Sequence, residues 1–315
     1  MTAGSAEDRL WELLRGALGT RALALAADLG VADALADGPR PVADLAAELH
    51  CDADTLRRLL RALASESVFA EKEPGVFRNT EASELLRTGW GSFAHLFGGP
   101  WLRTTSALEP SGDPSFPGLF GSDFWYWLAE NPDERRAFDH AMEQGNEDRV
   151  ERLAALPWRG DETVVDVGGG NGTLLLGLLE RHPGLRGIVF DLPETTRNEE
   201  TFGERCTFEA GSFFERVPAG DVYVLATILH DWDDPSAARI LKTIRAHAPA
   251  EARLLVLESV LAEGNEPDGA KWLDLLMLAL FAGRERDVAQ WRELLAAGGF
   301  EPVDIRNGLI EARCR

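Results

Sequence analysis

The stretch from Thr163 to Glu180, TVVDVGGGNGTLLLGLLE, constrains the fold more than any other part of the 315-residue chain. Its first five residues are apolar and rich in β-branched side chains, a pattern typical of a buried parallel strand. Glycines at alternate positions follow and permit a sharp turn close to a ligand. Leucines then recur at helical spacing. The stretch therefore predicts a strand, a glycine turn and a helix.

The glycine turn also limits the choice of ligand. A dinucleotide-binding turn has the form G-x-G-x-x-G, whose last glycine lets the helix pack on the strand. Thr173 occupies that last position, so the chain has G-x-G-x-G, which is similar to the turn of S-adenosylmethionine-dependent enzymes. A second strand pattern ends at Asp191, about 20 residues further on, where an acid can bind ribose hydroxyls. A solvated carboxylate at a strand end is the alternative for Asp191.

Strand and helix patterns alternate over the rest of the chain. Further strands are expected at 206–210, 221–226 and 253–258, and helices at 235–247, 268–281 and 287–297. This alternation predicts a parallel, doubly wound sheet. Residues 300–306 and 309–314 are expected to close the sheet as an antiparallel hairpin.

Composition excludes several classes of function. The net charge of −21 and the pI near 4.7 argue against a nucleic-acid partner and against an anionic membrane surface, since both need clustered Lys and Arg. Cys51, Cys206 and Cys314 are widely spaced, which excludes a disulfide framework and a cysteine zinc site and suits a reducing compartment. No apolar run approaches a membrane span, and no basic-then-apolar leader is visible. We expect a cytoplasmic protein.

Residues 8–88 are expected to form a compact, mainly helical unit. It begins with an apolar stripe of leucines at positions 10, 13, 14 and 18. A helix over 54–63, with Asp52 or Asp54 as its N-cap, precedes two short strands at 68–69 and 76–77. This is a winged-helix pattern, whose obvious function is DNA binding by Arg57, Arg58 and Arg61. The alternative, which the acidic surroundings favour, is a dimerisation scaffold with these arginines in surface ion pairs.

Aromatic residues gather between about 90 and 150, in the segment that joins the helical unit to the sheet. Most must be ordinary core, but ligand clefts tend to form between domains, so some are expected to line an apolar slot. Phe138 and Met142 share a helical face and are candidates for contact with a substrate.

The chemistry is expected to centre on His230. Ligands of doubly wound sheets bind outside the carboxyl ends of the strands, where the strand order reverses. The strand at 221–226 would lie across that switch point from the glycine turn, so His230 would project into the crevice. Histidine is the natural general base near neutral pH. Asp234 and Pro235 suit the N-cap and first position of the next helix. A metal site is a weaker alternative, because adjacent residues cannot all converge on one ion; its members would be His230, Asp231, Asp233 and Asp234.

Six motifs in this order carry a resemblance that covers nearly the whole chain. They are VDVGGGNG from Val165, FDLP from Phe190, GSFF from Gly211, LHDWDD from Leu229, LDLLM from Leu273 and GRER from Gly283. Together they resemble the S-adenosylmethionine-dependent O-methyltransferases of the caffeic-acid and hydroxyindole type, whose bacterial relatives tailor aromatic antibiotics.

The resemblance implies an architecture and a reaction. It implies a winged-helix dimerisation domain at 1–90, a helical connector contributing to the substrate pocket at 91–157, and a Rossmann-like catalytic domain at 158–315. It implies a homodimer that transfers a methyl group from S-adenosyl-L-methionine to a phenolic hydroxyl of a small or polycyclic aromatic metabolite, with S-adenosyl-L-homocysteine as product.

The resemblance also assigns residues to roles. His230 would be the catalytic base, held and polarised by Glu258 and Glu285. The residues implied for cofactor binding are Asp166, Gly168, Gly170, Gly172, Asp191, Leu192, Ser212 and Phe213. Those implied for the substrate are Phe138, Met142, Trp232, Asp274 and Met277. The alternative for Glu285 is a surface ion pair with Arg284 or Arg286, and for Glu258 a plain strand-end acid.

Two positions depart from the family pattern. Ser212 stands where the family has an acid that holds the adenine amino group, and Ala226 stands where it often has a basic residue. A serine hydroxyl makes a weaker hydrogen bond than a carboxylate. Some relatives bind the cofactor but perform hydroxylation, decarboxylation or ring formation, and retention of the three catalytic residues favours methyl transfer. A ligand-sensing, DNA-binding regulator is a further alternative.

Overall fold

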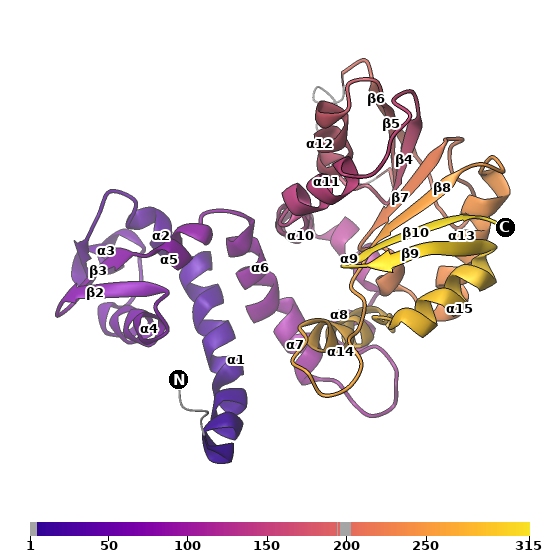
Figure 1. Cartoon of the computed structure of the whole chain (residues 1–315). Helices are drawn as coiled ribbons and strands as arrows, with labels where there is room; N and C mark the ends of the chain where they lie inside the picture. The colour runs from indigo at the N-terminus through magenta and orange to yellow at the C-terminus, as the bar shows by residue number, and fades with distance from the viewer. Residues whose placement is uncertain (1–4, 194, 196–202) are drawn as a thin grey trace. The chain divides into compact units, whose positions relative to one another are not determined.

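The computed structural model describes residues 5–193, 195 and 203–315. The chain forms two compact units (Figure 1). The first comprises Met1–Ser106 with Arg136–Gln144, and the second comprises Ala107–Arg135 with Gly145–Arg315. Residues of the expected connector at 91–157 are found in both units.

The first unit is mainly helical with a small sheet. Its helices are α1 (Ala6–Asp28), α2 (Val31–Ala34), α3 (Val42–Glu48), α4 (Ala53–Ser65), α5 (Glu81–Leu85), α6 (Gly89–Gly98), α7 (Pro100–Ser106) and most of α10 (Pro132–Met142). Its strands are β1 (Arg40–Pro41), β2 (Phe69–Glu73) and β3 (Val76–Asn79), which pair antiparallel in the order β1-β3-β2.

The winged-helix prediction for the first unit is confirmed. Asp52 is the N-cap of α4, because its carboxylate accepts the amide hydrogen of Thr55 at 2.8 Å. The wing is the β2–β3 hairpin. Two arginines of the expected recognition helix are in surface ion pairs: Arg58 with Asp54, and Arg61 with Glu71.

The apolar stripe of α1 does not enter the core of its own unit. The helix buries only small residues towards its C-terminal end, Ala24 and Ala26. The large apolar side chains of its first half are 50–75% exposed: Leu10, Trp11, Leu13, Leu14 and Leu18. A contiguous apolar face of this kind on one helix marks an interaction surface.

The second unit carries a seven-stranded sheet between helices. Its strands are β4 (Thr163–Val167), β5 (Arg186–Asp191), β6 (Cys206–Ala210), β7 (Val222–Ala226), β8 (Arg253–Leu257), β9 (Phe300–Arg306) and β10 (Leu309–Cys314). Its helices are α8 (Phe116–Phe120), α9 (Phe124–Glu130), α11 (Asn146–Ala154), α12 (Thr173–Arg181), α13 (Asp234–His247), α14 (Ala270–Phe281) and α15 (Val288–Gly298), with a short 3-10 turn, η2 (Leu229–Asp231).

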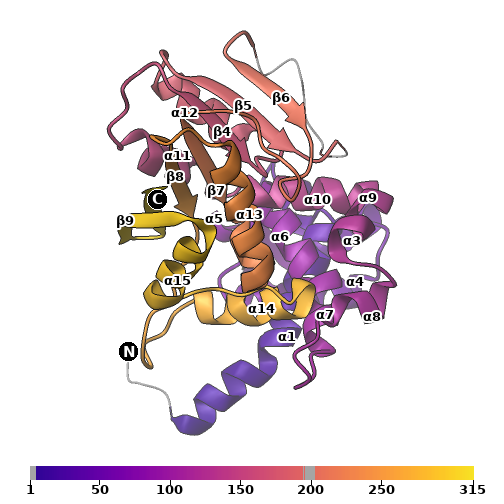
Figure 2. The same cartoon turned by 90° about the vertical axis from the view of Figure 1, so that its right-hand side faces the viewer.

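The strand order is β6-β5-β4-β7-β8-β10-β9, and β10 runs antiparallel to both of its neighbours. The predicted parallel sheet and closing hairpin are therefore confirmed. Alternate residues of each central strand face opposite layers. Val164 packs with α11 and α12, whereas Val165 packs with α13 and α15, on the other face of the sheet (Figures 1 and 2).

This topology brings four loops to one edge. β4, β5, β7 and β8 are parallel, so their carboxyl ends lie together, and the strand order reverses between β4 and β7. The glycine turn, Asp191, the His230 turn and Glu258 follow these four strands. Within the same unit, α8 joins α14 through the amide of Ser115 and the carbonyl of Ala279, 2.9 Å apart. No helix of the described residues is long and apolar enough to cross a membrane.

Candidate active site

Two backbone amides of the glycine turn after β4 form hydrogen bonds with β5. The amide of Gly168 donates to the carbonyl of Phe190 at 2.7 Å, and that of Gly170 donates to the carboxylate of Asp191 at 2.8 Å. Gly168 has φ +72°, and a Cβ there would lie 2.5 Å from Ile228. These two amides therefore bind groups of the protein and are not offered to a phosphate, which such turns bind through free amides.

Asp191 links the ends of β4 and β5. One carboxylate oxygen accepts the Gly170 amide, and the other accepts the amide of Leu192 at 2.6 Å and the hydroxyl of Thr195 at 2.7 Å. Two carboxylate oxygens offer about four lone-pair sites in all, and these three hydrogen bonds leave about one of them for a ribose hydroxyl. The side chain is held in place before any ligand arrives.

Asp166 is a buried acid beneath the same turn. It is 2% exposed, and its Oδ2 atom has no hydrogen-bond partner among the described residues. Burial, with a contribution from the charge of Asp191, raises the pKa of Asp166 to about 7. A cationic ligand above the turn would favour the ionised carboxylate, so this acid fits the sulfonium and ammonium charges of S-adenosylmethionine.

The loop after β6 carries Ser212 and places Phe213 and Phe214 against Trp232. The Ser212 hydroxyl accepts the amide of Phe214 at 3.3 Å, so it serves its own turn. The rings of Phe213 and Phe214 meet Trp232 edge-on, with centroids 6.0 and 4.7 Å away. All three rings are half-buried and pack against the core of the sheet. Trp232 thus lies beside the expected adenine-binding loop.

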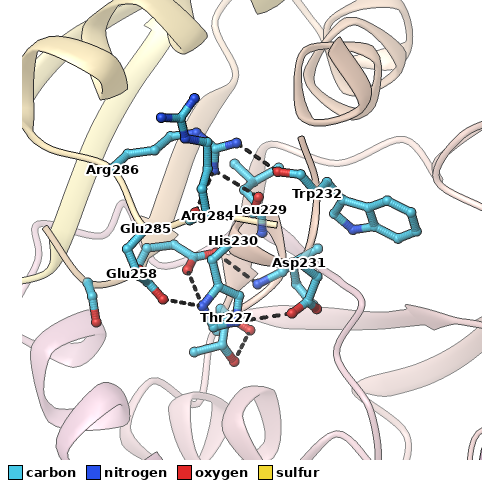
Figure 3. Close-up of polar contacts among 12 residues, drawn as sticks. Thr227, Leu229, His230, Asp231, Trp232, Glu258, Arg284, Glu285 and Arg286 are labelled. Atoms are coloured by element: carbon cyan, nitrogen blue, oxygen red, sulfur yellow. Dashed lines mark hydrogen bonds and ion pairs between the residues drawn. The ribbon is translucent and has the colours of Figure 1, made fainter. Parts of the chain in front are cut away.

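His230 lies in the 3-10 turn that follows β7, and Figure 3 shows carboxylates gathered around its ring. The imidazole is 8% exposed. Its Nδ1 atom is 2.6 Å from Glu285 Oε1 and 3.7 Å from Glu258 Oε2, and its Nε2 atom is 3.4 Å from Asp231 Oδ1. The 2.6 Å contact is a short, charge-assisted hydrogen bond.

Glu258 is more than a strand-end acid. It follows β8, is 3% exposed, and its Oε1 atom accepts the amides of Ile228 and Leu229, both at 2.8 Å. It therefore binds the backbone just before His230 and faces the imidazole with its other oxygen. That oxygen has no hydrogen-bond partner among the described residues.

The surface ion pair considered for Glu285 does not form. Glu285 is 1% exposed, and its neighbours Arg284 and Arg286 each pair with Asp234 at 2.9 Å.

The N-cap expected for the helix after His230 is wrong by one position. Asp233 caps α13 by accepting the amide of Ser236 at 2.8 Å, because Asp234 is turned towards the two arginines.

The carboxylates decide the charge of the imidazole. Burial alone would lower the pKa of His230, but the charges of Glu258 and Asp231 and the hydrogen bond that the imidazole donates to Glu285 raise it to about 10. Burial raises the pKa of Asp231 to about 7 and raises that of Glu258 as well. The acids therefore favour the protonated imidazole, and they titrate with it as a coupled group.

The residues considered for a metal do not converge. Asp233 and Asp234 are exposed and engaged elsewhere. The ligand atoms of His230, Glu258 and Glu285 lie within 4.8 Å of one another. However, two ligands of one tetrahedral ion, each about 2.1 Å from it, stand about 3.4 Å apart. The 2.6 Å between Nδ1 and Oε1 is the distance of a hydrogen bond.

The five expected substrate residues divide between the units. Asp274 and Met277 lie on α14. The Asp274 carboxylate accepts the backbone N–H of Glu285 at 2.8 Å, and the Met277 carbonyl accepts the backbone N–H of Gly283 at 3.2 Å. Both therefore support the loop that carries Glu285. Phe138 and Met142 are half-buried on α10, in the first unit.

Sequence reasoning missed the residues that hold the site's backbone. At Gly283 a Cβ would lie 2.1 Å from the carbonyl oxygen of His230, so only glycine permits this close approach. Arg286 is fully buried and binds the His230 turn. Both belong to the Gly-Arg-Glu-Arg motif, whose pattern does not reveal which of its charged residues is buried.

Comparison with known proteins agrees with this geometry. A model of the O-methyltransferase domain matches residues 102–301, and a model of the O-methyltransferase dimerisation domain matches residues 11–89. The chain is 38% identical over 306 residues to a phenazine O-methyltransferase of Lysobacter antibioticus, and the match covers 92% of this chain and 90% of the relative.

Solved structures give the same result. The crystal structure of LaPhzM has a TM-score of 0.93 at 36% identity, covering 99% of this chain and all of that one. An O-methyltransferase from neocarzinostatin biosynthesis, NcsB1, was solved with S-adenosyl-L-homocysteine and 1,4-dihydroxy-2-naphthoic acid. It has a TM-score of 0.80 at 33% identity, covering 94% of this chain and 96% of its own. The chain belongs to the S-adenosylmethionine-dependent O-methyltransferase family.

Proposed function

We propose that this enzyme methylates a phenolic hydroxyl of a small or polycyclic aromatic secondary metabolite, with His230 as general base. The observation that carries the proposal is the buried imidazole whose Nδ1 is bound by Glu285 at 2.6 Å. That bond leaves Nε2 as the nitrogen that can exchange a proton with an acceptor. The relatives support the acceptor class, because their names and ligands include a phenazine and a dihydroxynaphthoic acid.

Bound S-adenosylmethionine supplies an electrophilic methyl group on sulfur. The protein's task is then to orient the acceptor and take its proton as the bond forms. A phenol has a pKa near 10, and the carboxylates raise the pKa of His230 to about the same value. The raised pKa makes the neutral imidazole a stronger base towards the phenol than a free histidine would be. Glu285 fixes the tautomer and stabilises the imidazolium that results.

The cofactor is assigned to the loops after β4, β5 and β6. Asp166 would face its positive charges, Asp191 would bind its ribose beside Leu192, and the glycine turn would let it approach the backbone. Phe213 and Ser212 would contact its adenine. Trp232, Asp274, Met277, Phe138 and Met142 are assigned to the acceptor, and the segments 1–90, 91–157 and 158–315 to dimerisation, the substrate pocket and catalysis.

The test is incubation with methyl-labelled S-adenosylmethionine and a set of phenols, anilines and aromatic acids. We expect label in an aryl methyl ether and equimolar S-adenosyl-L-homocysteine. Label in an N-methyl product or a methyl ester would contradict the phenolic acceptor. Conversion of an acceptor without transfer of label would instead indicate one of the non-methylating chemistries.

We also assign the exposed face of α1 to a second copy of the chain. The dimerisation-domain match begins at residue 11 and includes the rest of this helix. Light scattering is expected to give twice the chain mass of 34.5 kDa. Leu14→Glu should shift the enzyme towards the monomer, whereas Val303→Glu, at an exposed valine of β9, should not. A monomeric parent enzyme would contradict the assignment.

The free thiols at Cys51, Cys206 and Cys314 support a cytoplasmic location.

A further inference from the structure

Arg286 is a fully buried arginine next to the catalytic base. Burying a guanidinium is costly unless its donors are satisfied, and an apolar side chain often serves the core equally well. Here its nitrogens donate mainly to one short segment. Nη1 donates to the carbonyl of Leu229 at 2.9 Å and Nη2 to that of Trp232 at 2.8 Å (Figure 3). Nε donates to the carboxylate of Asp234 at 2.9 Å, and Nη1 makes a longer contact with the carbonyl of Arg284 at 3.4 Å.

The two carbonyls bracket the base. Leu229 precedes His230, and Trp232 follows Asp231, so the guanidinium spans both ends of the segment that carries the imidazole. The turn holds itself only weakly: the amide of Asp231 is 3.3 Å from the carbonyl of Ile228, and the amide of Trp232 is 3.4 Å from that of Leu229. Hydrogen bonds of this length are poor, as is common in 3-10 turns.

Outside groups therefore hold the turn. Glu258 accepts the amides of Ile228 and Leu229, and Arg286 donates to the carbonyls of Leu229 and Trp232. A carboxylate thus binds the N–H groups of the turn, and a guanidinium binds its C=O groups. Both are charge-assisted contacts, which are stronger than neutral ones.

Arg286 directly follows Glu285, and its backbone is held by the chain beyond β8. Its carbonyl accepts the amide of Leu261 at 2.9 Å, and its backbone forms a parallel bridge with Val260 beyond β8. Its guanidinium carbon lies 5.5 Å from the ring centroid of Trp291. One residue therefore ties the backbone of the base to the backbone of the carboxylate that the base contacts.

We propose that Arg286 is a positioning residue, which holds the His230 imidazole against Glu285 by fixing the carbonyls on either side of it. The planar fork of the guanidinium is essential to this role, since its two terminal nitrogens reach two carbonyls at once. A lysine keeps the charge but has one nitrogen and cannot span them. The inference rests on the proposed role of His230 as the base.

Arg286→Lys is the test, with Arg292→Lys, at an exposed arginine of α15, as the matched control. We expect Arg286→Lys to lower kcat by about tenfold to a hundredfold, the usual effect of a small misplacement, and to leave the dissociation constant of S-adenosylmethionine unchanged. The imidazole should lose contact with Glu285, so the rising limb of the pH–rate profile should move to lower pH. The control should match the parent enzyme.

A direct measurement separates this inference from the proposed function. In enzyme with isotopically labelled histidine, the Nδ1 proton shared with Glu285 should give a strongly deshielded NMR resonance that Arg286→Lys abolishes and Arg292→Lys retains. This readout needs no substrate, so it holds even if His230 is not the base. If Arg286→Lys does not fold, Asp234→Asn takes its place. This change weakens the contact between the Arg286 guanidinium and residue 234, which is exposed, and it should weaken the same resonance.

Two outcomes would overturn the inference. One is a folded Arg286→Lys enzyme with parental kcat and an unshifted pH limb, even if its melting temperature falls, since that describes a purely structural role. The other is an Nδ1 resonance that stays unchanged in Arg286→Lys or, where that variant does not fold, in Asp234→Asn.

Discussion

His230→Ala is expected to lower kcat by about 10²–10⁴-fold, the usual contribution of a positioned general base. Affinity for S-adenosylmethionine should stay within a few-fold, because the cofactor is assigned to other loops. Initial rates with labelled cofactor measure the first effect, and titration calorimetry measures the second. The matched control is His247→Ala, since His247 is exposed on α13 and its ring hydrogen-bonds the carbonyl of Thr243 in the same helix. A His230→Ala enzyme with the parental rate would exclude the general-base role.

The same site gives a directional pH test. Against the effect of burial, the charges of Glu258 and Asp231 and the hydrogen bond donated to Glu285 raise the pKa of His230 to about 10, so kcat/KM should climb with pH as the imidazole loses its proton. Glu285→Gln removes one of these carboxylates, lowers the pKa of the imidazole, and should move the rising limb to lower pH. The plateau should also fall, because the neutral amide stabilises the imidazolium less. A limb that stays in place would show that Glu285 does not act on His230.

Local patterns were sufficient to predict the scaffold. A β-branched run, alternating glycines and leucines at helical spacing specify one strand, one turn and one helix with little help from the rest of the chain. The rule that ligands bind where strand order reverses then placed His230 near the turn. Both predictions depend on contacts close in sequence or on a general property of parallel sheets.

The choice of partners within the site could not be predicted. Asp233 and Asp234 are adjacent, precede the same proline and are equally good caps by composition. The choice is decided by Arg284 and Arg286, about 50 residues later in the sequence, which form ion pairs with Asp234 and leave Asp233 as the cap. For the same reason the motif could not show that Glu285 is buried while Arg284 remains partly exposed.

The aromatic segment illustrates a second limit. Its rings gather in the sequence but are distributed over both compact units. Within the second unit, Trp125 stacks on Phe281 with centroids 5.6 Å apart. Within the first unit, Trp90, Phe93 and Phe97 form a ladder along α6. Composition cannot reveal such a division, because long-range packing, and not local propensity, assigns each ring to its unit.

Asp166→Asn is expected to stabilise the ligand-free enzyme and to weaken cofactor binding. The raised pKa, about 7 against 3.8 for a free carboxyl, means that ionising this buried group opposes folding. A shift of about three units corresponds to roughly 4 kcal/mol, and we expect about 1–3 kcal/mol of gain, since the amide hydrogens also need partners. The melting temperature should therefore rise by several degrees above neutral pH.

The pH dependence of that gain identifies its cause. A group whose pKa is raised by folding stabilises the folded state below its unfolded pKa, and the contribution is lost as pH rises through the folded value. The advantage of Asp166→Asn should therefore be nearly absent close to pH 4, grow between 3.8 and about 7, and stay constant above. Calorimetric melting at several pH values measures it, with Asp161→Asn, at an 83% exposed side chain, as the control.

Cofactor titration of the same variant completes the test. If the carboxylate is retained because it faces the sulfonium and ammonium charges, Asp166→Asn should bind S-adenosylmethionine at least tenfold more weakly. It should lose less affinity for S-adenosyl-L-homocysteine, whose sulfur is neutral. A variant that is more stable yet binds both ligands like the parent enzyme would show that the buried charge does not serve the cofactor. A variant less stable than the parent above pH 7 would instead mean that Asp166 has a hydrogen-bonding role in the fold, because only a lost favourable contact can outweigh relief from desolvation.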